Sequence, residues 1–388
     1  MIAWSNKNVS NSVLDLRTML QLQQPDGRIP EMVFWQNCTP AQNANILKQY
    51  SNPYYTDITQ MPVLPYSLRA IYERSGNDKA VLEEFLLPLV NYFQWWRDAR
   101  DLDKNGLVYV IHGWESGLDA SPAYDEAYGV YVTDVNLTSY TELYPRFGQL
   151  IKTYKHAFKW NMTRILGRAS AAVEGDIGFE HFWFVQDVGL NCVYAGGWEV
   201  LGDLAAELGD AATADRCRAE AAASSAAIHA LMFSDEHSGY RTTYRDADGK
   251  RRFAKANTVQ NLFPLLLGDT PTDRVAALVG EVTSETKFNA PYALPTVAMD
   301  DPQFCPTFDY DLMWRGPVWG ITNWFVLEGL ARHGFDSAVD AVLDKWTALV
   351  QKSGIFEHYN PLTGEPYGAV GLGMSTLIVD WLYRTGRA

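Results

Sequence analysis

Apolar residues recur every three to four positions along most of the chain, and this helical periodicity dominates the sequence. It predicts helices at roughly 10–24, 64–76, 79–99, 146–168, 187–208, 210–232, 255–267, 272–284, 317–333, 336–352 and 373–386. Asn77-Asp78 indicates a helix start, and Gly334 indicates a helix stop. Short β-like segments lie at 107–111 and 239–244. The pattern therefore predicts an all-α protein with little strand.

Composition narrows the class of protein. The chain has 388 residues, of which 47% are hydrophobic, and no low-complexity linker divides it, so we expect a single domain. The net charge of −14 disfavours nucleic acid, whose binding relies on Lys and Arg. No apolar run is long enough to predict a membrane span, and the first residues do not resemble a signal peptide. The scattered Cys38, Cys192, Cys217 and Cys305 disfavour a zinc site and a disulfide framework, so we expect a cytoplasmic protein.

The segment from Trp114 to Pro122 is the most informative in the sequence. It combines an aromatic residue and two carboxylates, Glu115 and Asp119, with a Gly and a Pro that favour a loop. An aromatic ring can cover the apolar face of a sugar, and carboxylates can move protons or bind hydroxyls. Glycoside hydrolysis needs a second carboxyl group, for which Glu357 in the turn-rich segment 356–364 is a candidate.

Three motifs resemble glycoside hydrolase family 63 and its relatives, which include mannosylglycerate and glucosylglycerate hydrolases. They are residues 114–119, 314–319 and 357–364, with weaker similarity at 24–30 and 59–62. The motifs follow the family's order and span nearly the whole chain. The resemblance implies an (α/α)6 barrel of six inner and six outer helices. Because the predicted helices are one short, we expect residues 1–388 to form one such domain that is N-terminally incomplete, less stable and less active than a longer form.

The resemblance also implies roles for individual residues. Asp119 matches the family's general acid, which must be protonated near neutral pH, and Glu357 matches the general base of an inverting mechanism. Without the resemblance, an acid such as Asp119 would more often be a solvated helix cap. The other residues expected to bind substrate are Gln60, Trp114, Glu115, Trp314, Arg315, Gly316, His358 and Tyr359.

Several of these residues have a second interpretation. Glu115 is expected to be a like-charge neighbour of Asp119 or a ligand of a sugar hydroxyl. The planar guanidinium of Arg315 could bind hydroxyls or a carboxylate, or it could form an ion pair with Asp309 or Asp311. His358 and Tyr359 could position a water, or they could only pack.

The segment from Trp314 to Trp319 suggests two kinds of ligand contact. An indole ring could stack on a sugar, and the backbone could approach the ligand closely. Trp114 and Trp314 are the stronger candidates for stacking on a sugar ring, and Trp319 is the weaker one. Gly316 would let the backbone approach a ligand, and Pro317 suits the first turn of a helix.

A metal site is not expected. Asp101, Asp103 and Asn105 resemble the first half of a calcium loop, but His112 stands where an EF-hand needs a bidentate Glu. A simple turn before a strand is therefore favoured. His156, His181 and His237 lack metal-ligand spacing, and we expect no cofactor.

We therefore expect an inverting glycoside hydrolase that acts on an α-glucoside or α-mannoside. The chain lacks the long insertions of oligosaccharide-processing members, which favours a small substrate such as glucosylglycerate or mannosylglycerate. An oligosaccharide α-glucosidase is the closest alternative. A sugar epimerase on the same toroid would need paired histidines, which are not evident here. A degenerate sugar-binding protein is disfavoured by the presence of both Asp119 and Glu357. A carbohydrate small molecule is the only partner expected.

Overall fold

The computed structural model describes residues 1–34, 54–56, 58–110, 113–119, 121–127, 185–246, 249–307 and 313–387, and all structural statements concern these residues. The α-helices are α1 (Ile2–Ser5), α2 (Val9–Leu20), α4 (Leu64–Arg74), α5 (Lys79–Arg100), α9 (Val188–Leu208), α10 (Ala211–Leu231), α11 (Thr272–Thr283), α12 (Gly320–Arg332), α13 (Asp336–Ser353) and α14 (Leu377–Arg384). Short 3-10 helices are η1 (Gly113–Ser116), η2 (Pro122–Tyr124), η4 (Val259–Leu266) and η5 (Gly373–Thr376). The helix predicted at 146–168 lies outside the described residues.

Strands in the described parts are short and antiparallel. β1 (Val185–Gln186), β4 (Thr243–Arg245) and β5 (Arg251–Phe253) form one small sheet in the order β1-β4-β5. β2 (Phe233–Ser234) pairs with β3 (Gly239–Tyr240), and β6 (Phe356–Tyr359) pairs with β7 (Pro366–Val370). The β-like segments predicted at 107–111 and 239–244 correspond to an isolated bridge between Val110 and Val185 and to β3 and β4.

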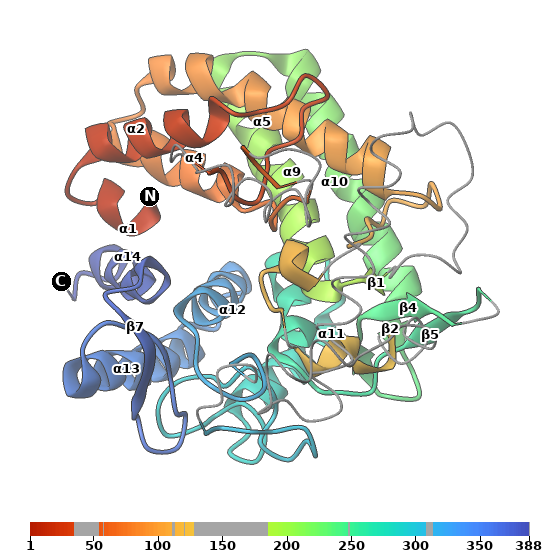
Figure 1. The fold of residues 1–388 in the computed structure, drawn as a ribbon, viewed down its shortest axis with the longest axis vertical. Coiled ribbons are helices and arrows are strands. Elements are labelled where there is room, and N and C mark those ends of the chain that lie inside the picture. The colour runs from red at the N-terminus through yellow and green to blue at the C-terminus, as the bar shows by residue number, and fades with distance from the viewer. Residues whose placement is uncertain are drawn as a thin grey trace, which may run out of the picture.

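The helices stand around a central axis (Figure 1). Helix α9 packs against α4, α5 and α10, and α12 packs against α13, α14 and η4. Helix α1 contacts α14, so the two ends of the described chain meet. The fold is therefore mostly helical, as the periodicity predicts. No helix among the described residues has the length and apolarity that crossing a membrane requires.

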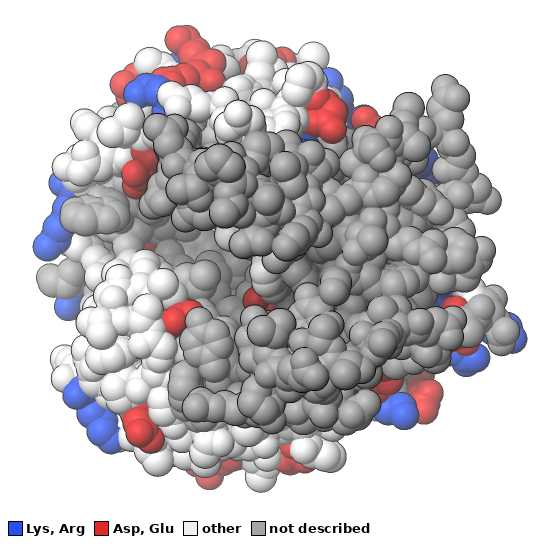
Figure 2. Space-filling view, in the orientation of Figure 1, with Lys and Arg blue, Asp and Glu red and all other residues white. Residues whose placement is uncertain are grey.

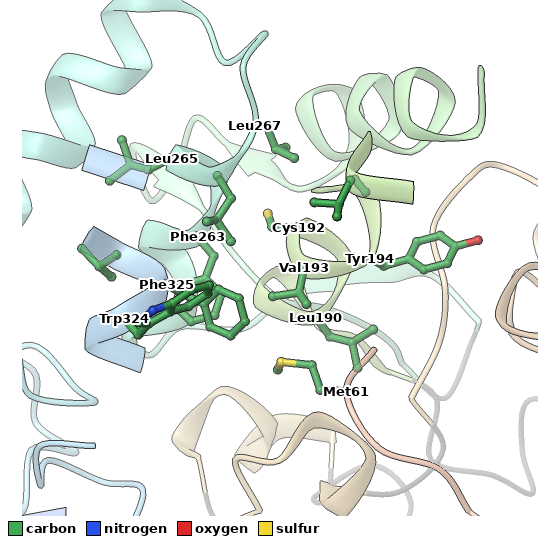
Figure 3. Packing of buried hydrophobic residues seen from close by; sticks show 14 of the residues in the cluster. Met61, Leu190, Cys192, Val193, Tyr194, Phe263, Leu265, Leu267, Trp324 and Phe325 are labelled. Carbon is green, nitrogen blue, oxygen red and sulfur yellow. The ribbon is translucent and has the colours of Figure 1, made fainter. Parts of the chain in front are cut away.

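The core cluster combines side chains from α4, α5, α9, α12, α13 and η4, and Figure 3 shows the part where α9, η4 and α12 meet. Helix α9 is buried on almost every side, and a Cβ placed on Gly197 would lie only 2.5 Å from the Phe93 ring, so glycine allows the close approach of α5. The Ala-rich α10 buries only part of its surface, as expected of an outer helix. Each large apolar side chain that is fully buried contributes about 1.5–3 kcal/mol.

Several predicted helix boundaries need correction. Helix α12 begins at Gly320 and not at Pro317, because Val318 pairs with the backbone of Tyr359 before the helix starts. The segment predicted at 255–267 is the 3-10 helix η4, which contains Pro264. The predicted start at Asn77-Asp78 is confirmed, since the Asp78 side chain accepts a hydrogen bond from the Ala80 N–H at 3.0 Å.

Candidate active site

The segment that carries Asp119 forms two short 3-10 helices. Trp114 and Glu115 lie on η1, Gly117 turns the chain with a φ of +70°, and Asp119 lies in the turn before η2. Trp114 and Asp119 are both partly exposed. The loop expected from the Gly and the Pro is thus a compact, defined turn.

Glu115 is fully buried and forms an ion pair. Its Oε1 accepts hydrogen bonds from Arg100 Nη2 at 2.8 Å and from the Thr59 backbone N–H at 3.4 Å. The Arg100 guanidinium also lies 4.9 Å from the centre of the Trp95 ring. The expected acidic neighbour of Asp119 is therefore held in place by a cation from α5.

A third carboxylate, Glu31, joins Glu115 and Asp119. The Gln60 Nε2 donates a hydrogen bond to Glu31 Oε1 at 3.2 Å, which places the expected substrate ligand Gln60 in this cluster. Burial, followed by the negative charges of Asp119 and Glu115, raises the pKa of Glu31 to about 8. Sequence reasoning missed Glu31, and the only available signal was its position directly after the weakly matching segment 24–30.

Acidic side chains are also visible within the hollowed middle of the face shown in Figure 2. Carboxylate oxygens accept hydrogen bonds from hydroxyl groups such as those of a sugar.

A buried network holds the residues that follow Asp119. The Tyr124 hydroxyl donates to Asp187 Oδ2 at 2.8 Å, and Gln260 Nε2 donates to the same oxygen at 2.8 Å. Ser121 Oγ donates to Gln260 Oε1 at 2.9 Å. Asp187 also caps α9 by accepting from the Leu190 N–H, and burial raises its pKa. These bonds fix η2 against the start of α9 and against η4.

Arg315 forms an ion pair with Asp125, just after η2. Its Nη1 donates to Asp125 Oδ2 at 3.0 Å, its Nη2 contacts Asp125 Oδ1, and Gln303 Oε1 accepts a further bond at 3.1 Å. Burial raises the pKa of Asp125 to about 6, while the ion pair acts in the opposite direction. Arg315 therefore forms an ion pair with Asp125. The expected partners Asp309 and Asp311 lie outside the described residues, so an ion pair with either of them stays a prediction.

Gly316 is required by the contact between two backbone segments. Its φ is +153°, and a Cβ at this position would lie 2.7 Å from the Cys305 carbonyl oxygen. The Gly316 N–H donates to Thr296 Oγ1 at 2.9 Å. Glycine therefore allows a close approach to Cys305, and the expected approach of Gly316 to a ligand stays a prediction.

The aromatic residues of the second and third motifs form a continuous stack. The Trp314 and Trp319 rings lie 3.9 Å apart and nearly parallel, and Trp319 lies 4.9 Å from the His358 ring. All three side chains are buried, and burial lowers the pKa of His358 to about 4, so its imidazole is neutral at pH 7. The stack ties the strand that carries Glu357 to the start of α12.

Glu357 lies on β6, at an irregularity of the β6–β7 hairpin. Phe356 pairs with Val370 and His358 with Tyr367, so Gly368 and Ala369 together face Glu357. The Ala369 N–H donates to Glu357 Oε2 at 2.9 Å. A bulge of this kind re-aims a side chain and frees a backbone donor from the ladder. The segment that we expected to be a turn-rich loop is therefore a hairpin that fixes the carboxylate.

A prediction follows from Gly368, which packs directly on Glu357. Its φ is +73°, and a Cβ would lie 2.8 Å from Glu357 Cβ and closer still to Oε2. Gly371 has a φ of +74° but no atom within 4 Å of its would-be Cβ. Gly368→Ala and Gly371→Ala should each cost about 1–2 kcal/mol of stability through backbone strain. Only Gly368→Ala should also displace the Glu357 carboxylate, and if Glu357 is catalytic, kcat should fall by up to about 100-fold. Equal kcat values for the two variants would contradict this role of Gly368.

Tyr359 is committed to the backbone of its own hairpin. Its hydroxyl donates to the Gly354 carbonyl at 2.8 Å and accepts from the Phe356 N–H at 2.8 Å, and its ring is fully buried. This geometry favours the packing interpretation. The following turn is closed by Asn360, whose Oδ1 accepts from the Leu362 and Thr363 N–H groups.

The three motifs, distant in sequence, are joined in space. The Arg315–Asp125 ion pair connects residues 313–320 to the segment that carries Asp119. Val318 and Tyr359 exchange backbone hydrogen bonds of 2.8 and 3.1 Å, which connects residues 313–320 to the strand that carries Glu357. The expected acid and base thus belong to one assembly.

The segment with a partial calcium-loop pattern is a protein-stabilised turn. The Asp101 carboxylate accepts from the Asn105 and Gly106 N–H groups at 3.0 and 2.9 Å. Asp103 accepts from the Tyr109 hydroxyl at 2.9 Å and forms an ion pair with Arg245. Both carboxylates are thus engaged by protein donors, which supports the turn interpretation.

Comparison with known proteins places this assembly in context. A family model described as "Mannosylglycerate hydrolase MGH1-like glycoside hydrolase domain" matches residues 2–375. The chain is 30% identical over 380 residues to mannosylglycerate hydrolase MGH1 of Selaginella moellendorffii, covering 96% of this chain and 76% of that protein. It is 27% identical over 437 residues to the glucosylglycerate hydrolase of Mycolicibacterium hassiacum, covering 97% and 88%. The crystal structure of the GH63 mannosylglycerate hydrolase from Thermus thermophilus in complex with glucose superposes with a TM-score of 0.78 at 25% identity, covering 98% and 90%.

Proposed function

Because the chain belongs to the mannosylglycerate hydrolase MGH1-like glycoside hydrolases, we propose that it hydrolyses a small α-glycoside of glycerate by an inverting mechanism. The family resemblance indicated by the three motifs is confirmed, and the chain is a glycoside hydrolase. We further propose that residues 1–388 form a single (α/α)6 barrel domain. The helices around a central axis and the contact between α1 and α14 support this arrangement.

The proposal that Asp119 and Glu357 are the catalytic pair is supported by the contacts that join the three motifs. Asp119 follows Glu115 by four residues in the turn after η1, and its charge raises the pKa of Glu31. Glu357 is held by the Ala369 N–H on the hairpin that Val318 ties to the Arg315 segment. The turn that carries Asp119 and the hairpin that carries Glu357 could in this way present both carboxyl groups to one substrate.

In the proposed reaction, Asp119 donates its proton to the glycosidic oxygen while the bond from the anomeric carbon to that oxygen breaks. Glu357 accepts a proton from a water molecule, whose oxygen bonds to the anomeric carbon from the opposite face. An inverting pair needs room for that water, so we expect the carboxyl groups to be roughly 6.5–9.5 Å apart. Trp114 is proposed to cover a sugar face, and Gln60 to bind a hydroxyl.

A substrate panel tests the proposal. We expect hydrolysis of mannosylglycerate or glucosylglycerate, and much slower hydrolysis of α-linked oligosaccharides. The reverse preference would favour the oligosaccharide α-glucosidase alternative. No release of sugar from any α-glucoside or α-mannoside would favour a non-catalytic sugar-binding protein.

The stereochemistry of the first product is a separate prediction. An inverting enzyme converts an α-glycoside to the β-anomer, because water attacks the face opposite the leaving group. Proton NMR during the first minutes of hydrolysis should show the β-anomer before mutarotation produces the α-anomer. Initial accumulation of the α-anomer would show retention and would require Glu357 to act as a nucleophile.

A further inference from the structure

Gln260 lies where η2, η4 and the start of α9 meet. It belongs to the first turn of η4, and its side chain is fully buried. It packs closely on α9, because a Cβ placed on Gly189 would lie 3.0 Å from Gln260 Cβ. Its amide contacts both ends of η2: Oε1 accepts from Ser121 Oγ at 2.9 Å, and Nε2 donates to the Tyr124 hydroxyl at 3.0 Å. One side chain therefore joins η2 to η4 and α9.

Asp187 determines which way the Gln260 amide points. Its Oδ2 accepts hydrogen bonds from Gln260 Nε2 and from the Tyr124 hydroxyl, both at 2.8 Å, and from Thr242 Oγ1 at 3.3 Å. An oxygen surrounded by three donors acts as an acceptor, so the donor end of the amide must face Asp187. The acceptor end then faces Ser121, whose hydroxyl must donate to it. The direction of each bond is thereby fixed, and the amide is held in one orientation.

Ser121 connects Gln260 to the turn that carries Asp119. The Ser121 N–H donates to the Leu118 carbonyl at 3.0 Å, and Asp119 lies within the turn that this bond closes. Ser121 Oγ also accepts from the Ala123 N–H at 3.4 Å, so the same side chain caps η2. Ser121 is only 1% exposed, which shields its bond to Gln260 from competition by solvent. The backbone on either side of Ser121 is therefore held by its contact with Gln260.

We propose that Gln260 is a positioning residue for the general acid: through Ser121 it holds the turn that carries Asp119 in the geometry that proton donation to the glycosidic oxygen requires. This inference rests on the proposed function, in which Asp119 is the general acid. Gln260 is fully buried, so it acts through Ser121 and not by contact with the substrate. A catalytic group that is misplaced by about 1 Å can lose about 100-fold in rate.

The first test compares Gln260→Met with Asn261→Leu. Asn261, the next residue of η4, is also a buried amide, but it donates to the Ala256 carbonyl and to Asn257 Oδ1 and not to η2. Gln260→Met should lower kcat on a glycerate glycoside by about 10–100-fold. It should lower kcat much less on an activated aryl glycoside, whose leaving group does not need the proton of Asp119. Asn261→Leu should change kcat on both substrates by the same small factor.

Ser121→Ala is the milder variant, and it provides the test if Gln260→Met does not fold. It removes the bond to Gln260 and leaves the bonds between Gln260 and Asp187 in place, so it should show the same difference between the two substrates. Adding it to Gln260→Met should lower kcat no further, because both changes break one contact. Losses that are equal on the two substrates would show a merely structural role and would overturn the proposal, as would losses that multiply in the double variant.

A second measurement, hydrogen exchange followed by mass spectrometry, does not depend on turnover. Backbone exchange in the segment 113–124 should become faster in Gln260→Met and in Ser121→Ala, and it should be unchanged in Asn261→Leu. Unchanged exchange in the first two variants would overturn the proposal even if their activity fell. Faster exchange in a protein that hydrolyses no glycoside would support the anchoring of this segment and would refute the proposed function alone.

Discussion

Asp119→Asn is expected to lower kcat by about 10²–10⁴-fold with a glycerate glycoside, because general acid assistance to a poor leaving group is lost. The same variant should lose far less activity with an aryl glycoside whose leaving group needs no proton. Glu365→Gln is the matched control, since Glu365 is an exposed carboxylate in the β6–β7 turn. Thermal unfolding should be close to that of the wild type, because Asn occupies nearly the same volume as Asp.

Glu357→Gln is expected to lower kcat by a similar factor, but with both classes of substrate. Activation of water is needed whichever leaving group departs, so an activated aryl glycoside cannot compensate. The contrast between the two variants separates the acid from the base. If either variant kept more than about a tenth of wild-type kcat on the glycerate glycoside, that residue would not have the role proposed here.

The sequence predicts the helices well wherever apolar spacing and end signals agree. Asp78 caps α5, and α12 ends at Arg332, shortly before Gly334 with its φ of +74°. The errors occur where tertiary contacts override local preference. Pro317 would suit a first helical turn, but the backbone pairing of Val318 with Tyr359 delays the helix to Gly320. The β6–β7 hairpin escaped prediction because its turn residues resemble those of an irregular loop.

The candidate site is only partly readable from the sequence. Motif similarity singles out Asp119, Glu357 and Gln60 as candidates, because each lies in a compact segment with several characteristic neighbours. It does not identify Arg100 or Asp125, whose partners lie 15 and 190 positions away in the chain. Charge pairing of this kind depends on which faces meet in space, and local patterns carry no information about it. Glu31 was missed for the same reason.

The Arg100–Glu115 ion pair should contribute strongly to stability. Their side chains are 11% and 0% exposed. Removal of one partner from a buried pair leaves the other charge without compensation, and it typically costs about 3–5 kcal/mol. Arg100→Met should therefore lower the free energy of unfolding by about that amount in urea titrations. It should also remove the contact of the guanidinium with Trp95.

Two further variants isolate the contribution of the charge. Arg17→Met breaks the ion pair with Glu84, whose side chains are 45% and 40% exposed, and it should cost only about 0–1 kcal/mol. Adding Glu115→Gln to Arg100→Met removes the stranded carboxylate, so the double variant should regain a large part of the lost stability. A double variant as unstable as Arg100→Met would show that packing, and not the uncompensated charge, causes the loss. Because Glu115 lies four residues before Asp119, stability regained in the double variant without activity would show that the pair also positions the general acid.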